Sequence, residues 1–249
     1  MIQNTRSGDQ PTDRGVSEVM GFVIVFGIII GSVGFLYMTG FQAMGDFQQH
    51  EQQKNADYAM DALAENFNDI VRNDGVLERS GELNLREGTI RTDSDGPIEN
   101  VTVDGDNILD DHLGEDLSGM GAFTYTYEGN TVAYQGGGVV KTDGSGAITV
   151  RDPLIQCHDG VAIVSLVVVD GDDTSLMSHG GLEITAIDRG TTVENGSDLE
   201  LEFDTDSEYY PAWNRTLESR GFETNGGTIT CEDPDHVVVR ITTIEIDYN

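Results

Sequence analysis

The sequence predicts an α+β protein, in which a long N-terminal helix is followed by an antiparallel β-sandwich-like head domain. Residues 19–45 contain no charged side chain, and residues 46–71 contain neither Pro nor Gly. From residue 76 onward, helical periodicity gives way to short alternating segments separated by Asp, Gly, Asn and Ser. We therefore expect a transmembrane and then amphipathic helix over residues 16–75, and a β-rich extracellular domain over residues 76–249.

The composition is strongly acidic. The chain has 249 residues, with 45 Asp and Glu against 13 Lys and Arg, so its net charge is −32. A field this negative repels phosphate backbones, which excludes nucleic-acid binding through a basic patch. The acidity fits either a surface for a cationic partner or adaptation to high salt. Because the acidic residues are scattered after residue 45, and only Lys54 and Lys141 are lysines, we favour high salt.

The uncharged stretch Val19–Gly45 is long enough to cross a bilayer. About 20 helical residues, each rising about 1.5 Å, span a hydrocarbon core roughly 30 Å thick. Tyr37 and Phe41 lie near its far end, where interfacial aromatic residues occur. A buried core helix and a secretory signal cut after Ala43-Met44-Gly45 are the alternatives. The stretch is longer and less polar than either requires, so we expect a single membrane span.

The charges around this stretch predict its orientation. Arg6 and Arg14 precede it, and the first basic residue after it is Lys54. This bias places the N-terminus in the cytoplasm and the rest of the chain outside.

The residues before the span resemble a known signal. Arg14-Gly15, followed by Val16-Ser17-Glu18-Val19-Met20-Gly21 and an aliphatic run, resembles the class III signal of archaeal type IV pilins and pilin-like proteins, and is most similar to haloarchaeal members. The resemblance covers the N-terminal segment only. It implies that a prepilin peptidase cuts between Gly15 and Val16, so that residues 1–15 are a cleaved leader and the apolar helix stays on the mature chain.

The same resemblance suggests how subunits assemble. Gly27 and Gly31 form a Gly-x-x-x-Gly pair, which lets helices approach closely, although glycine is common in membrane helices generally. In bacterial relatives, an acidic residue near the mature N-terminus pairs with the terminal amine of a neighbouring subunit. Glu18 is displaced from that position, and it fits equally well as a charge that marks the membrane interface.

Beyond the span, the pattern predicts that the helix lies on the head. Ala59, Leu63, Phe67 and Ile70–Val71 recur at helical spacing on one side. Asn73-Asp74-Gly75 then supplies a helix stop.

The head is predicted to consist of short strands. Alternation or apolar runs indicate strands at residues 82–91, 97–103, 123–127, 131–135, 139–141, 147–150, 161–170, 182–188, 199–203, 228–231 and 237–248. Val161–Val169 is nearly all apolar, which predicts a central strand covered on both faces. Residues 171–181 and 204–227 are expected to be the longer surface loops.

Cys157 and Cys231 are the only cysteines. Outside the membrane an even pair is most simply a disulfide, worth about 2–4 kcal/mol. Free thiols remain an alternative. So does a zinc site completed by His158 and His236, although no Cys-x-x-Cys spacing supports it.

Three acidic loops suggest calcium binding. They are Asp93–Asp95, Asp104–Asp111 and Asp170–Asp173, and none matches an EF-hand loop. Since nearly one residue in five is acidic, such clusters also arise from composition alone. We therefore predict no metal site.

Asn100, Asn195 and Asn214 begin Asn-x-Ser/Thr sequons and are predicted glycosylation sites. The sequence contains no nucleophile elbow, zinc-protease motif or phosphate-binding loop, so we expect neither an enzyme nor a cofactor.

These observations favour a type IV pilin-like surface subunit. Its N-terminal helix anchors it and assembles it with copies of itself or with other pilin-like subunits, and its acidic head serves adhesion or surface interaction. The alternative is a single-pass surface protein that does not polymerise and whose β domain binds a ligand.

Overall fold

The computed structural model describes residues 12–73, 75–85, 87–94, 96–114, 117, 119–171, 174–177 and 180–248. Within the first helix, the side chains of residues 12–17, 42, 43, 45, 46 and 49 lie outside this description.

Helix α1 spans Thr12–Arg72 and ends immediately before the predicted stop at Asn73. The chain forms two compact units, Met1–Glu51 and Gln52–Asn249, so the last turns of α1 belong to the second unit. We call this second unit the head, and residues 52–72 of α1 the docked segment. An apolar helix followed by a β-rich head confirms the predicted α+β class.

The described strands of the head form three sheets. The first has the order β1-β12-β16-β10-β9, the second β11-β2-β5-β6-β7-β8, and the third β14-β15-β13-β3-β4. Their bounds are β1 Glu78–Leu85, β2 Thr89–Asp93, β3 Ile98–Val103, β4 Asp106–Asn107, β5 Ala122–Tyr127, β6 Asn130–Gln135, β7 Gly138–Thr142, β8 Ala147–Arg151, β9 Leu154–His158, β10 Val161–Asp170, β11 Thr174–Met177, β12 Gly180–Gly196, β13 Leu199–Phe203, β14 Glu223–Asn225, β15 Thr228–Thr230 and β16 His236–Tyr248.

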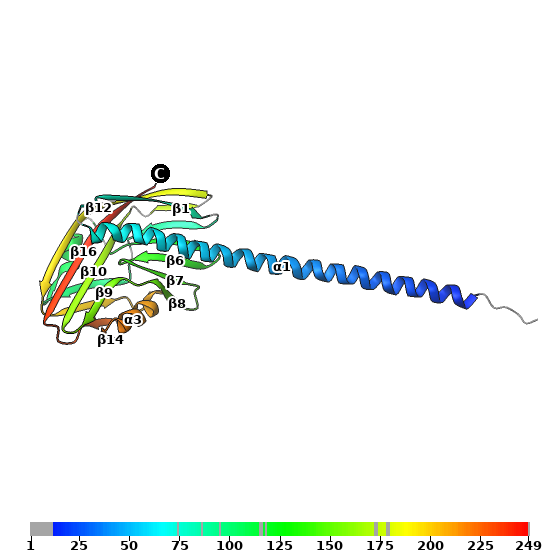
Figure 1. Cartoon of the computed structure of the whole chain (residues 1–249). Coiled ribbons are helices and arrows are strands. Elements are labelled where there is room, and N and C mark those ends of the chain that lie inside the picture. Colours follow the sequence, from blue (N-terminus) through cyan, green and yellow to red (C-terminus); the bar gives the residue numbers. More distant parts are fainter. Residues whose placement is uncertain are drawn as a thin grey trace, which may run out of the picture. The chain divides into compact units, whose positions relative to one another are not determined.

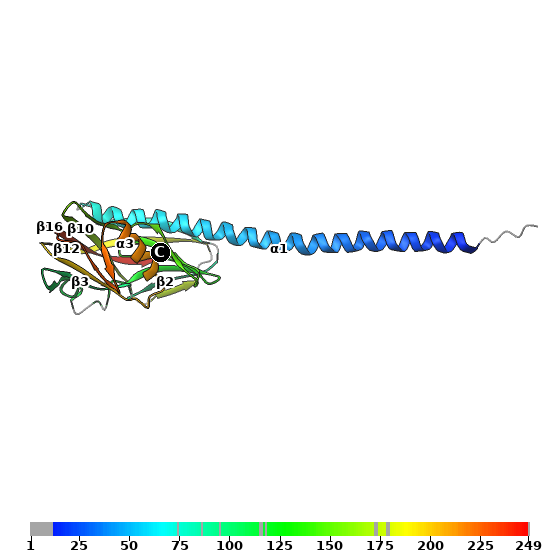
Figure 2. The same cartoon turned by 90° about the horizontal axis from the view of Figure 1, so that it is seen from below.

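Strand β10 lies between two hydrophobic cores. Val167 and Val169 pack in the core that contains the docked segment. Leu166 and Val168 point the other way, into the core that the third sheet covers. Figure 2 shows β3 of the third sheet on the other side of the head from the docked segment. The prediction of a central strand covered on both faces is confirmed, because each face of β10 has its own core to fill.

Among the described strands the pairing is antiparallel except between β10 and β16, which run parallel in register from Val161 opposite His236 to Asp170 opposite Glu245. The single strand expected at residues 82–91 is instead the end of β1 and the start of β2. Gly88, with a φ of 142°, lies between them. Alternation indicates that a segment is extended, but it does not reveal a turn within the segment or the direction of the partner strand.

The prediction of long surface loops at 171–181 and 204–227 is wrong. The first range contains β11 and the start of β12, and the second contains helix α3, Tyr210–Ser219, and β14. Trp213 and Leu217 form one buried side of α3, and Pro211 occupies its first turn. With so few apolar residues among Asp, Ser and Glu, the segment resembled a polar loop.

A second short helix, α2 (Ile108–Leu113), packs Leu109 into the core beside the third sheet. The Asn107 side chain caps it by accepting hydrogen bonds from the amides of Leu109 (3.2 Å) and Asp110 (3.3 Å).

Candidate functional site: the apolar and docked segments of the N-terminal helix

The apolar segment of α1, Glu18–Phe41, is long and hydrophobic enough to cross a membrane. It has 24 residues, its most apolar window has a mean hydropathy of 2.6, and none of that window is buried. A soluble core helix would bury this surface, because exposed apolar area costs about 25 cal/mol per Å². The segment is therefore compatible with membrane anchoring.

The serine and threonine hydroxyl groups of this segment are bonded within the helix. Ser32 Oγ donates to the carbonyl of Ile29 at 2.9 Å, and Thr39 Oγ1 donates to that of Phe35 at 2.9 Å. Such internal bonds let a helix carry hydroxyls into hydrocarbon, where water is absent. The rings of Tyr37 and Phe41 lie 4.4 Å apart, at the end where interfacial aromatic residues were expected.

Gly27 and Gly31 lie in open surroundings. A Cβ atom added to either would meet no heavy atom within 4 Å, once the helix's own nearby backbone is set aside. The packing of this single chain therefore gives no reason for a glycine at these positions, and a close partner helix would give one.

The predicted processing residues Arg14, Gly15 and Val16 fall in the first turns of α1, and their side chains lie outside the described part. Glu18 is exposed at the start of the apolar segment.

The docked segment fills the core between the first two sheets. Phe67 is fully buried, with its ring 5.1 Å from that of Tyr134 on β6 and 6.3 Å from that of Phe123 on β5. Figure 1 shows this part of α1, in cyan, running along the sheet that contains β6. The predicted docking of the second half of the helix on the head is confirmed.

A buried polar network fixes the position of this segment. Asn68, which is 1% exposed, donates through Nδ2 to the carbonyl of Gly137 at 2.9 Å and accepts through Oδ1 from the hydroxyl of Tyr134 at 2.9 Å. Burial raises the pKa of Tyr134, so its hydroxyl remains a donor. Asn68 was not recognised from the sequence. The one signal available was a polar residue between Phe67 and Ile70 on a helix that otherwise buries apolar side chains.

Ion pairs surround this network. Lys141 Nζ lies 2.5 Å from Asp57 Oδ2, Arg151 Nε lies 2.6 Å from Asp61 Oδ1, and Arg79 Nη2 lies 2.5 Å from Asp69 Oδ2. The hydrogen bond that Arg151 donates to the Asp61 carboxylate raises the pKa of Arg151. Three of the few cations in this acidic chain therefore hold the docked segment.

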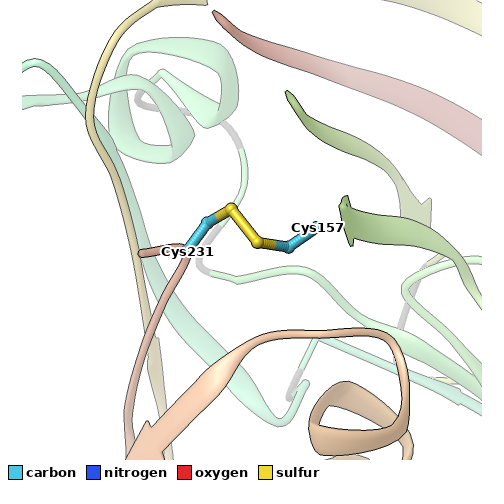
Figure 3. The surroundings of a disulfide bond; sticks show 2 residues. All are labelled: Cys157 and Cys231. Atoms are coloured by element: carbon cyan, nitrogen blue, oxygen red, sulfur yellow. A yellow bond between two sulfur atoms is a disulfide. The ribbon is translucent and has the colours of Figure 1, made fainter. Parts of the chain in front are cut away.

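Cys157 and Cys231 form a disulfide, with Cα atoms 5.8 Å apart and 74 residues apart in sequence. Figure 3 shows the bond joining the strand that carries Cys157 to the segment that carries Cys231. The amide of Cys157 also donates to the carbonyl of Arg220 at 2.9 Å. Gly221 follows with a φ of 90°, and a Cβ added there would lie 2.1 Å from the Cys157 carbonyl oxygen, so only glycine permits this approach. The predicted disulfide is present. It excludes the two alternatives for these cysteines, free thiols and a zinc site.

The three sequons differ in accessibility. Asn100 is half-buried, donates to Glu202 and accepts from Asn107 at 2.8 Å. Asn214 bonds Tyr210 and Glu218 within α3, and Thr216 of its sequon is buried. Asn195 is exposed on β12. The folded head therefore leaves Asn195 the most accessible of the three.

Among the described residues, no group of three or more His, Cys, Asp or Glu side chains is arranged to hold a metal ion. Asp104 instead accepts hydrogen bonds from the amides of Ser197 and Asp198, both at 2.9 Å, and these bonds lower its pKa. Asp95 and Asp173, from the other two acidic loops, lie outside the described residues.

His112 on α2 joins the layers of the head. Its ring nitrogens lie 2.7 Å from Thr192 Oγ1 and 2.8 Å from Thr243 Oγ1, and burial lowers its pKa. Two hydroxyl partners and a neutral ring indicate a structural role.

Comparison with curated proteins and with solved structures gives no significant match. A family model described as a family of unknown function, DUF7289, matches residues 14–247. The match begins at the Arg14-Gly15 pair and extends to the end of β16, so helix and head together are what the family shares. The chain belongs to this family of unknown function, DUF7289.

Proposed function

We propose that this chain is a type IV pilin-like surface subunit. A prepilin peptidase cuts between Gly15 and Val16, the apolar segment holds the subunit in the cell membrane with its N-terminus on the cytoplasmic side, and the head faces outward. Copies of the chain, or other pilin-like subunits, then pack their apolar segments together in a surface filament.

One observation carries this proposal. Arg14-Gly15 stands directly before an exposed apolar segment of 24 residues, which continues as one helix, α1, into the docked segment. A signal sequence that is removed is not expected to form one continuous helix with a segment packed in the core of the folded domain. A retained assembly helix is expected to be continuous in this way, because it must link the filament core to the head.

The charge of the head suits an exposed position in brine. Dense carboxylates keep a surface hydrated, and salt at high concentration screens their mutual repulsion. We therefore place the subunit on the surface of a salt-adapted archaeal cell. Asn195 is its preferred glycosylation site because that side chain is exposed.

N-terminal sequencing of the mature protein tests the proposal. In membranes that contain a prepilin peptidase, we expect the wild-type chain to begin at Val16. Gly15→Leu should retain residues 1–15, because a larger side chain at the cleavage site blocks the peptidase. Gly8→Leu, the same change inside the leader, should be processed normally. A wild-type chain that begins at Met1 or Asp46 would overturn the proposal.

The second candidate is a single-pass surface protein that binds a ligand and does not polymerise. A polar cavity of about 400 Å³ in the head favours it. Negative-stain microscopy of the purified chain distinguishes the two candidates, since only the first forms filaments.

A further inference from the structure

We propose that this polar cavity is a binding site for a neutral saccharide. It lies over β2, β5 and β6, and the segment of residues 204–209 that leads into α3 forms another of its walls. Its volume falls within the range of about 300–1,000 Å³ that small-molecule sites occupy. The proposal goes beyond pilin-like assembly, because it concerns the head alone.

Strand alternation gives the sheet two different faces. Ile90, Phe123 and Tyr134 point into the core of the docked segment. The residue that follows each of them in the sequence lies on the opposite face and lines the cavity. These residues are Arg91, Thr124 and Gln135. The hydroxyls of Thr126 and Thr131, which also line it, lie 3.0 Å apart. The sheet therefore presents hydrogen-bonding groups where a second core would need apolar ones.

Gln135 is the observation that points to a ligand. Its side chain is 1% exposed, and its Nε2 atom is buried without a hydrogen-bond partner in the described part of the chain. Leaving such a group unpaired costs about 1–3 kcal/mol. A ligand oxygen in the cavity would accept this hydrogen bond and remove the cost. A buried donor without a partner calls for an explanation, and a ligand bound in the adjoining cavity is one.

The charges around the cavity narrow the class of ligand. Arg91 lines the cavity together with three carboxylates, those of Asp93, Asp204 and Glu208, so the net negative charge of the wall would repel an anion. A bare cation fits poorly, because Gln135 offers a donor and no metal-binding group exists among the described residues. A neutral ligand must therefore both donate to carboxylates and accept from an amide and a guanidinium. Sugar hydroxyls do both.

Tyr209 adds an aromatic side chain to the wall of the cavity. Burial, together with the Glu208 carboxylate, raises its pKa, so its hydroxyl stays protonated. An aromatic side chain with a polar tip suits a ligand that is apolar on its ring faces and polar at its rim.

The carboxylate wall is held in place before a ligand arrives. The amide of Asp204 donates to the Pro97 carbonyl at 3.0 Å, and Asp204 Oδ1 accepts from the amide of Asp206 at 2.9 Å. The Ser207 amide closes the turn on the Asp204 carbonyl at 3.3 Å. A fixed turn lowers the entropic cost of binding.

The test uses the full chain in lipid nanodiscs or in a detergent without a sugar headgroup, since a maltoside would compete for the site. Glucose, galactose, mannose and N-acetylglucosamine are the probes, measured by saturation-transfer NMR and titration. At least one should bind the wild-type chain. Gln135→Met, which keeps the volume but removes the donor, and Glu208→Gln should each weaken binding roughly tenfold. Asp206→Asn, in the same turn but outside the cavity wall, should bind as the wild type does.

The outcomes separate clearly. Absence of binding by all four sugars, or equal binding by Gln135→Met and Glu208→Gln, overturns the proposal. So does binding of calcium chloride that depends on Glu208 while the sugars fail to bind. If Gln135→Met does not fold, the exposed Glu208→Gln variant decides. Because sugar binding requires neither cleavage nor assembly, its failure is independent of the N-terminal sequencing result.

Discussion

At the scale of single residues, Asn68 ties α1 to the head through buried hydrogen bonds. Replacing it with Leu leaves two buried partners unsatisfied, the Tyr134 hydroxyl and the Gly137 carbonyl. Each costs about 1–3 kcal/mol, so we expect Asn68→Leu to lower the free energy of unfolding by about 2–6 kcal/mol. Urea denaturation of the full chain, followed by the fluorescence of the single buried Trp213, measures this change.

A double-mutant cycle with Tyr134→Phe provides the control. The phenylalanine keeps the ring packed against Phe67 and removes only the hydroxyl. Because the hydrogen bond between Asn68 and Tyr134 can be lost only once, the double variant should be less destabilised than the sum of the single variants. Additive losses, or an Asn68→Leu variant as stable as the wild type, would show that this network does not hold the helix.

At the scale of elements, substitution of the glycines in the apolar segment tests the proposed assembly. Gly27→Leu combined with Gly31→Leu fills open space in the single chain, so the thermal unfolding of the head should not change. If these glycines form a helix contact surface, the same variant should lose filaments in negative-stain images. Gly40→Leu, on roughly the opposite side of the helix at about 100° per residue, should still assemble. Filaments of normal abundance in the double variant would rule out this contact surface.

At the same scale, the sequence predicted some elements well and others poorly. The end of α1 followed from Asn73-Asp74-Gly75, because a helix stop is a local signal. Helix α3 was not predicted, because its large buried apolar side chains are only Trp213 and Leu217. These side chains pack against residues that are distant in the chain. Gln135 could not be recognised either. A polar residue on an alternating strand looks solvent-exposed until residues 204–209 are placed beside it.

At the scale of the whole molecule, net charge should govern stability. Within the first sheet, Glu82 on β1 lies directly opposite Glu183 on β12, and both are exposed. Like charges opposite each other destabilise a sheet. Each exposed ion pair stabilises the folded protein by only about 0–1 kcal/mol. Repulsion should therefore dominate at low salt. Raising KCl from about 0.1 M to about 1 M shortens the Debye length from about 10 Å to about 3 Å and should raise Tm.

A stabilisation of about 1–2 kcal/mol corresponds to a rise in Tm of roughly 2–8 °C, which calorimetry of the full chain resolves. Glu82→Gln should raise Tm at low salt and reduce its dependence on salt. Glu218→Gln is the matched control, because Glu218 accepts hydrogen bonds from Asn214 and Thr224 and gains nothing from neutralisation. A Tm that falls with added KCl would show that ion pairs outweigh repulsion.

The way α1 is held in the head also determines how the protein responds to tension. The Phe67 ring contacts, the Asn68 hydrogen bonds and the ion pairs of Asp57, Asp61 and Asp69 are spread along several turns of one rigid helix. A force along the helix axis therefore loads these contacts together, in shear. They share the force and do not break one after another. A head that holds its helix in this way resists withdrawal of the helix under a pulling force.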